Sequence, residues 1–141
     1  MKQELRDKLI KKFPDIFPDE KVGPSGYPGK KTRLLPFQFG CGDGWFQLLY
    51  DLCTDFKKEM EPEDHLIAQQ VKEKFGGLRF YANYDHDKYK KIQDIINAAE
   101  SKSHKICEQC GKPGRNREDL SWMRTLCDVC RTELDIKDII E

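Results

Sequence analysis

The sequence predicts an α+β protein, in which a small core of helices and one β-hairpin is followed by a C-terminal module organised around four cysteines. Apolar residues recur at spacings of three and four over 45–60 and again over 88–101, as in helices that pack on a core. A Gly-Gly pair at 76–77 separates two strand-like runs and indicates a hairpin. Two Cys-x-x-Cys pairs follow, sixteen residues apart. We therefore expect a core over 1–103 and the module over 104–141.

The N-terminal region is predicted to be a short helix followed by a long irregular segment. Residues 2–13 have an amphipathic pattern that ends at Pro14. Prolines and glycines interrupt 14–40, so no regular element is expected there. The basic stretch Lys30-Lys31-Thr32-Arg33 lacks the glycine and hydroxyl positions of a phosphate-binding loop and is interpreted as a surface loop.

The two helices predicted in the core each follow an aspartate that can act as an N-terminal cap. Asp43 precedes the helix over 45–60, and Asp85 with Asp87 precedes the helix over 88–101. Asp85-His86-Asp87 is interpreted as capping sequence and not as a metal site, because adjacent side chains point in different directions. Cys53 lies on the apolar stripe and is expected to be buried. Cys41 lies where a thiolate is favoured, but a packed loop cysteine is the simpler interpretation.

Residues 66–84 are predicted to form the β-hairpin, with Gly76-Gly77 as its turn. That turn pairs Phe75 with Leu78, Val71 with Ala82, and Lys72 with Tyr81. The opposite face of the hairpin carries Lys72, Lys74, Arg79 and Tyr81. Basic side chains interleaved with an aromatic ring are found on nucleic-acid-binding surfaces, but an ordinary solvated strand face has the same pattern.

The four cysteines of the module are predicted to bind one zinc ion. Cys107, Cys110, Cys127 and Cys130 have the spacing of a tetrahedral four-thiolate site. Such a site has no open coordination position, so the zinc is expected to be structural. Gly111 suits a tight knuckle after the first pair. A loop over 114–119, a strand over 120–126 and a helix after Cys130 complete the order of elements found in treble-clef zinc fingers.

Composition narrows the functions that this chain can have. The formal net charge is zero, which argues against bulk attraction to nucleic acid or to an anionic membrane. No apolar run approaches the roughly 20 residues that span a bilayer, and the charged N-terminus is unlike an export signal. We therefore expect a cytoplasmic protein whose cysteines are metal ligands and buried thiols. The sequence contains no recognisable catalytic constellation, so an enzyme is not expected.

Several motifs resemble those of known families. Residues 105–132 are similar to zinc fingers of the GATA type and of the DksA/TraR family, which imply contact with DNA and with RNA polymerase, respectively. GDGWF at 42–46, VKEKFGGLRFY at 71–81, ICEQCG at 106–111 and TLCDVC at 125–130 together resemble a group of small uncharacterised proteins of bacteria, phages and prophages. This resemblance implies a cytoplasmic zinc protein and transfers no catalytic residue.

Two functions are therefore predicted. The first is a protein-interaction module, as in a phage- or prophage-type regulator or inhibitor of another protein, with the candidate contact residues Tyr27, Phe37 and Trp45. The alternative is a nucleic-acid-binding, transcription-related zinc-finger protein, with the candidate residues Lys72, Lys74, Arg79, Arg115, Arg117 and Arg124. The sequence leaves the partner and the oligomeric state open.

Overall fold

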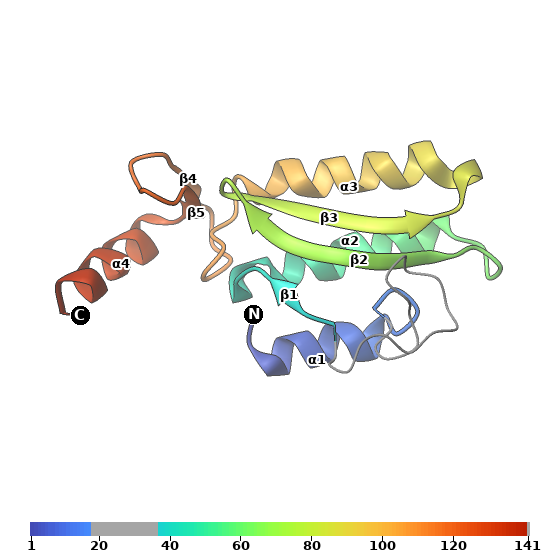
Figure 1. Cartoon of the computed structure of the whole chain (residues 1–141), viewed down its shortest axis with the longest axis horizontal. Coiled ribbons are helices and arrows are strands. Elements are labelled where there is room, and N and C mark those ends of the chain that lie inside the picture. The colour runs from blue at the N-terminus through green and yellow to red at the C-terminus, as the bar shows by residue number, and fades with distance from the viewer. Residues whose placement is uncertain (18–36, 141) are drawn as a thin grey trace.

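The structure, a computed structural model, describes residues 1–17 and 37–140 of the 141-residue chain and has the predicted α+β architecture (Figure 1). The helices are α1 (Gln3–Lys12), α2 (Phe46–Glu59), α3 (Tyr89–Ser103) and α4 (Asp128–Ile140), with short 3-10 helices at Asp43–Trp45 and His86–Lys88. The strands are β1 (Phe39–Gly40), β2 (Leu66–Lys74), β3 (Gly77–Tyr84), β4 (Arg115–Arg117) and β5 (Arg124–Leu126).

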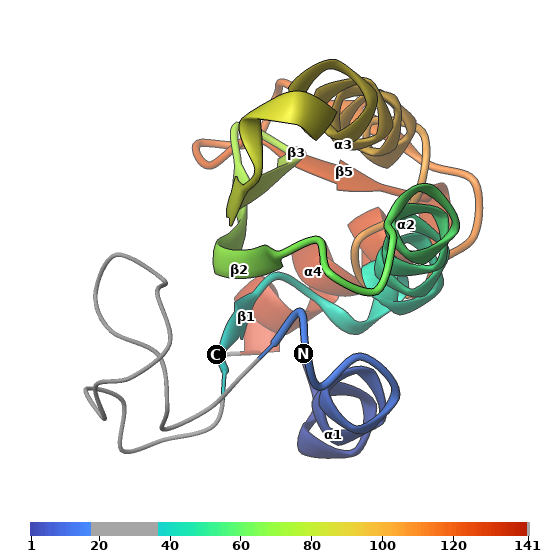
Figure 2. The ribbon, with the colours of Figure 1, turned by 90° about the vertical axis from the view of Figure 1, so that its right-hand side faces the viewer.

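The core is a three-stranded sheet covered by helices. The strand order is β1-β2-β3, with β1 parallel to β2 and β2 antiparallel to β3. Figure 2 shows α2 and α3 side by side on one face of this sheet, and α1 beyond its β1 edge. The second sheet, a β4–β5 hairpin, lies with α4 at one end of the molecule (Figure 1). Within the described residues, none of the helices has the length and apolarity needed to cross a membrane.

Aromatic rings fill the space between the sheet and the helices. Phe17 has its ring centroid 5.1 Å from that of Phe37 and 5.0 Å from that of Phe39. The Phe56 ring from α2 lies 5.5 Å from the Phe80 ring on β3. Each of these side chains is buried, and each such burial contributes about 1.5–3 kcal/mol to folding. The apolar stripes of α2 and α3 therefore point into this core, as predicted, although Tyr89 remains 57 % exposed.

The hairpin forms where predicted, but its register differs by two residues. The turn is Phe75-Gly76, both with left-handed φ angles of 54° and 81°, which is the geometry of a tight hairpin turn. Lys74 therefore pairs with Gly77, Val71 with Phe80, and Lys72 with Arg79. Gly77 lies outside the turn, and a Cβ there would lie 2.6 Å from the His104 ring, so that ring would have to shift. The second glycine is therefore the first residue of β3 and not part of the turn.

Two aspartates that were predicted to cap helices, Asp43 and Asp85, accept hydrogen bonds from other segments of the chain instead. Asp43 lies inside the first 3-10 helix, and its carboxylate accepts a 2.7 Å hydrogen bond from the backbone N–H of Lys2. Asp85 accepts a 2.9 Å bond from the backbone N–H of His65, ahead of β2. In both cases the aspartate joins segments distant in the sequence, so local spacing alone assigned it the wrong partner.

Candidate metal centre

The first pair of cysteines lies in a tight turn between α3 and β4. Cys107 accepts a 2.9 Å hydrogen bond from the backbone N–H of Gly111, and its own N–H donates to the carbonyl of Lys112 at 2.8 Å. Gly111 has a φ of 84°, which only glycine adopts without strain, so the chain turns back directly after Cys110. This knuckle places the side chains of Cys107 and Cys110 on the same side of the turn.

The second pair lies at the start of the last helix. Cys127 follows β5 directly, and Cys130 falls in the first turn of α4. The backbone N–H of Cys130 donates to the Cys127 sulfur at 3.4 Å, which lowers the pKa of that thiol to about 7. Burial raises the pKa of the Cys130 thiol. Loading a metal here must therefore release protons, because only thiolates bind it.

The four sulfur atoms form one compact cluster. All lie within 4.8 Å of one another, and those of Cys110 and Cys127 are 3.6 Å apart. Zinc–thiolate bonds of about 2.3 Å in a tetrahedron require sulfur separations of about 3.8 Å. Cys110 is exposed and the other three cysteines are buried. The cluster (Cys107, Cys110, Cys127 and Cys130) can thus hold a metal ion in a closed four-thiolate site, as the spacing predicts.

The module around this cluster has few apolar side chains of its own. Leu126 is its fully buried leucine, and Leu120 and Leu134 pack against the cluster while partly exposed. A knuckle, the β4–β5 hairpin and α4 follow one another in the predicted order, although β4 occupies part of the predicted loop and β5 is shorter than the predicted strand.

The knuckle is docked on the core through the GDGWF motif. Glu108, inside the first Cys-x-x-Cys pair, accepts hydrogen bonds from Gly42 N–H on its carboxylate (2.8 Å) and from Gly44 N–H on its carbonyl (2.7 Å). The Trp45 indole N–H donates to the carbonyl of Ile106 at 2.9 Å. Burial raises the pKa of Glu108, and the Gly42 hydrogen bond opposes that rise.

Both glycines of this motif permit a close approach of two backbones. A Cβ at Gly44 would lie 2.1 Å from the carbonyl oxygen of Cys107, and one at Gly42 would lie 2.5 Å from that of Glu108. Either contact is too short for any real side chain. In the sequence, this docking is marked only by Gly42 and Gly44 on either side of Asp43. Such a pattern does not predict which distant segment will contact the two glycines.

A second contact joins the hairpin turn to the β4–β5 hairpin. The Thr125 hydroxyl donates to the carbonyl of Gly76 at 2.6 Å, and the Trp122 indole N–H donates to Glu73 at 3.0 Å. The other carboxylate oxygen of Glu73 accepts from Gly76 N–H at 2.8 Å. Thr125 also joins the two sides of the module, because its carbonyl accepts from Glu108 N–H at 3.0 Å. All four sequence motifs therefore meet at one interface between the core and the module.

The two predicted partner-binding residues that the structure describes, Phe37 and Trp45, are buried. Phe37 and Trp45 are 1 % and 0 % exposed, so both are core residues, and that prediction is wrong for them. Their aromatic character reflects packing, and the Trp45 indole is already bonded to Ile106. Tyr27 and the basic stretch 30–33 lie outside the described residues. Cys41, which directly precedes the GDGWF motif, is buried. Burial raises the pKa of its thiol to about 12, so Cys41 is a packed thiol, as predicted.

The predicted nucleic-acid-binding residues divide into two groups. Lys72 and Arg79 are cross-strand neighbours, and Lys74 and Tyr81 are exposed on the same hairpin. Arg117, by contrast, is 5 % exposed and donates to the carbonyl of Leu126 and to Asp128, so its guanidinium is not available to a phosphate.

Arg115 is exposed and Arg124 is half-buried, where its charge acts on Glu108. The prediction is therefore wrong for Arg117, and the remaining residues stay candidates.

The fold and site define a small α+β protein with a closed four-cysteine cluster that can hold a metal ion. Comparisons with protein families, curated proteins and solved structures found no match to this chain.

Proposed function

We propose that this protein is a zinc-stabilised protein-interaction module that regulates or inhibits another protein. One observation carries the proposal: two large aromatic side chains, Phe75 and Trp122, are 64 % and 68 % exposed at the junction of the core and the module. Aromatic side chains are enriched in protein–protein interfaces, and tryptophan is among the residues that contribute most to binding energy there. We call Phe75 and Trp122 the aromatic pair.

The aromatic pair is held in place by a single carboxylate. Glu73 accepts the Trp122 indole N–H and also the Gly76 N–H of the turn that presents Phe75. The Lys74 ammonium lies 5.6 Å from the centre of the Phe75 ring and offers a polar rim beside it. Pre-organised anchors lose little conformational entropy on binding, which favours a specific complex.

Zinc is the metal that best suits the cluster. Four thiolates select a soft or borderline cation, and the sulfur spacing matches a tetrahedral zinc site. Its role is structural, since four cysteines leave no position for a substrate. Elemental analysis of the purified protein tests this directly, with one zinc per chain expected and less than half in a Cys110→Ser variant. A fully loaded wild-type site containing another metal would overturn the assignment.

The interaction proposal is tested with the tagged, zinc-loaded protein purified from its native host. Proteins that co-purify at a fixed stoichiometry with the wild type should be lost from a Phe75→Ala/Trp122→Ala variant. Tyr89→Ala is the matched control, because Tyr89 is 57 % exposed and is the first residue of α3, a helix whose N-terminal end lies away from the β4–β5 hairpin (Figure 1). Equal recovery from the double variant and the wild type would remove the aromatic pair from the proposal.

The alternative is single-stranded nucleic-acid binding by the outer face of the hairpin. It is favoured by one specific observation, the Lys72–Arg79 cross-strand pair beside exposed Tyr81 and Phe75. Backbone attraction by lysine and arginine with base stacking on aromatic rings is the usual chemistry of such surfaces. Fluorescence anisotropy with a labelled oligonucleotide tests it: binding should weaken with added salt and in a Lys72→Ala/Arg79→Ala variant. An affinity that changes neither with added salt nor in the Lys72→Ala/Arg79→Ala variant would eliminate this alternative.

A further inference from the structure

The four cysteines of the cluster differ in their access to solvent. Three of them are buried, and Cys110 alone is exposed. Its neighbours Gln109 and Gly111 are exposed as well, so this side of the knuckle is open. A small molecule in solution can therefore approach Cys110 more readily than the other three cysteines.

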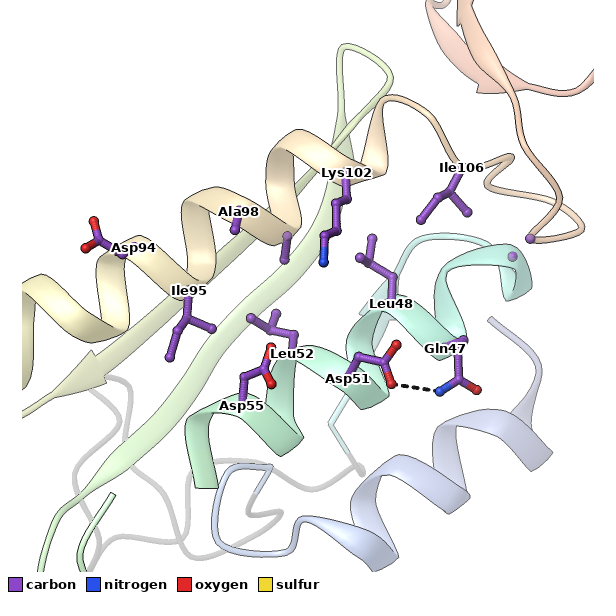
Figure 3. Close-up of a pocket in the computed structure, with 13 residues that line it drawn as sticks. Gln47, Leu48, Asp51, Leu52, Asp55, Asp94, Ile95, Ala98, Lys102 and Ile106 are labelled. Atoms are coloured by element: carbon purple, nitrogen blue, oxygen red, sulfur yellow. Dashed lines mark hydrogen bonds between the residues drawn. The ribbon is translucent and has the colours of Figure 1, made fainter. Parts of the chain in front are cut away.

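Solvent also reaches the knuckle from the side of the core. A groove of about 460 Å³ between α2 and α3 ends there, with Ile106 and Gly111 among its lining residues (Figure 3). A water molecule takes up about 30 Å³ in the liquid, so the groove has room for many. Because Gly111 directly follows Cys110, the chain beside this cysteine is hydrated on the side of the groove too.

A second sulfur lies close to that of Cys110. The Cys127 sulfur is 3.6 Å away, so the two need to approach by about 1.6 Å to reach the length of a disulfide bond, about 2.0 Å. Cys127 is 9 % exposed, compared with 0 % for Cys107 and 4 % for Cys130. An accessible cysteine beside a second thiol is the arrangement typical of residues that undergo reversible oxidation.

The two cysteines outside the cluster do not compete for such a reaction. Cys41 and Cys53 are 6 % and 0 % exposed and pack in the core. Burial raises the pKa of both thiols, so neither provides a thiolate at neutral pH. Oxidation of the folded chain is thereby directed to the cluster.

We propose that Cys110 is a site of oxidation by hydroperoxides and that Cys127 converts the oxidised residue to a disulfide. A cysteine bound to zinc is a thiolate, the form that attacks peroxides. The Cys110 sulfur attacks the terminal oxygen, so an S–O bond forms and the O–O bond breaks. The other oxygen takes a proton from water and leaves as an alcohol, or as water when hydrogen peroxide is the oxidant. Cys110 is then a sulfenic acid.

The second step joins the two cysteines. The Cys127 thiolate attacks the Cys110 sulfur, so the S–S bond forms, the S–O bond breaks and hydroxide leaves. In total, two thiolates are oxidised, one hydroperoxide is reduced and two electrons are transferred. Cys107 and Cys130 remain as ligands, which is too few for a closed tetrahedral site, so the metal is released.

Release of the metal detaches α4 from the knuckle. Cys130 lies in the first turn of α4 and loses its link to Cys107 through the metal. Leu134, which packs against the cluster, is only partly buried. An isolated helix as short as α4, which has 13 residues, is marginal in water. Oxidation should therefore unfold α4, and reduction with fresh zinc should restore it.

The test is treatment of the full-length, zinc-loaded protein with one equivalent of hydrogen peroxide per chain. A colorimetric indicator measures released zinc, and mass spectrometry of alkylated peptides locates the disulfide. We expect release of one zinc per chain, a disulfide between Cys110 and Cys127, and four of the six thiols still free. A dithiol reductant and zinc should reverse all three changes, because a disulfide is reducible and a sulfinic acid is not.

One variant with a matched control isolates the exposed sulfur. Cys110→His keeps a fourth donor for zinc and removes that sulfur, so it should release zinc about tenfold more slowly than the wild type. Cys53→Ala, which removes a buried thiol from α2, should release zinc at the wild-type rate. Zinc content and an amide spectrum confirm each variant beforehand. If Cys110→His does not load zinc, the position of the disulfide in the wild type still decides.

The proposal fails if the treated wild type keeps its zinc and its thiols, if the disulfide joins another pair, or if Cys110→His reacts as fast as the wild type. Zinc loss that a reductant does not reverse would also overturn it. Phe75→Ala/Trp122→Ala should be oxidised like the wild type, because the aromatic pair takes no part in the reaction. Failure here and failure of the aromatic pair are therefore separate results.

Discussion

The core and the C-terminal module are stabilised by different forces. The core buries a continuous set of aromatic and aliphatic side chains from three helices and a sheet. The module has Leu126 and four cysteines, with two leucines packed at its edge. Among the described side chains, a set this small offsets only part of the conformational entropy of ordering the module, so a metal held by the cluster would contribute much of the module's stability. This difference predicts that the two parts of the chain have separate conditions for folding.

Metal removal is expected to separate the two parts most strongly. A chelator, or Cys107→Ser, should unfold the module and leave the core folded, because structural zinc contributes on the order of 10 kcal/mol. Amide resonances of 104–140 should collapse while those of buried core residues such as Leu49 and Ile92 persist. Loss of both sets of signals together would show that the core also depends on the metal.

A large-to-small substitution in the core should destabilise the core and leave the metal content of the cluster unchanged. Phe56 is fully buried against Phe80, so Phe56→Ala should lower the free energy of unfolding by about 3–5 kcal/mol. Urea denaturation followed by circular dichroism measures this. Below the transition, zinc stoichiometry should remain one per chain. Reduced stoichiometry in the folded variant would mean that the module cannot hold its metal without an intact core.

The interface between the two parts is tested by Gly44→Ala. The added Cβ would meet the carbonyl of Cys107, so one backbone must move, at a cost of about 1–3 kcal/mol. Two unfolding transitions should replace one when core and module are followed by separate probes. Gly40→Ala is the control, since its Cβ would lie 3.2 Å from the Lys72 Cβ, a contact that smaller shifts relieve. Identical behaviour of the two variants would argue against a tight interface.

The smallest effect is expected from the ion pair that joins β4 to α4. Arg117 donates to Asp128 at 2.7 Å and holds the pKa of that carboxyl below its usual range. A lowered pKa in the folded state means that this contribution is complete above about pH 4 and is lost as pH falls through the folded value. Asp128→Asn should therefore slightly reduce module stability at neutral pH. A carboxyl ¹³C titration that gives an ordinary pKa for Asp128 would contradict this.

The sequence by itself determined the helices, the existence of the hairpin and the four cysteines of the cluster. Each of these depends on a local repeat: apolar spacing in α2 and α3, a glycine-containing turn, and two Cys-x-x-Cys pairs. Such features can be predicted from the sequence because the residues that determine them lie only a few positions apart. Side-chain burial at Phe56 and Ile96 was predictable for the same reason.

The tertiary structure alone decided the register and the docking. Gly77 was predicted to lie in the turn, but it is the first residue of β3, where a Cβ would come within 2.6 Å of the His104 ring. Trp45 and Arg117 were predicted to be surface contacts, yet both are buried. Each donates a hydrogen bond to a backbone carbonyl, Trp45 to that of Ile106 and Arg117 to that of Leu126. Gly42 meets Glu108 across 66 residues of sequence. Contacts of this range depend on how whole elements pack, and no local pattern encodes them.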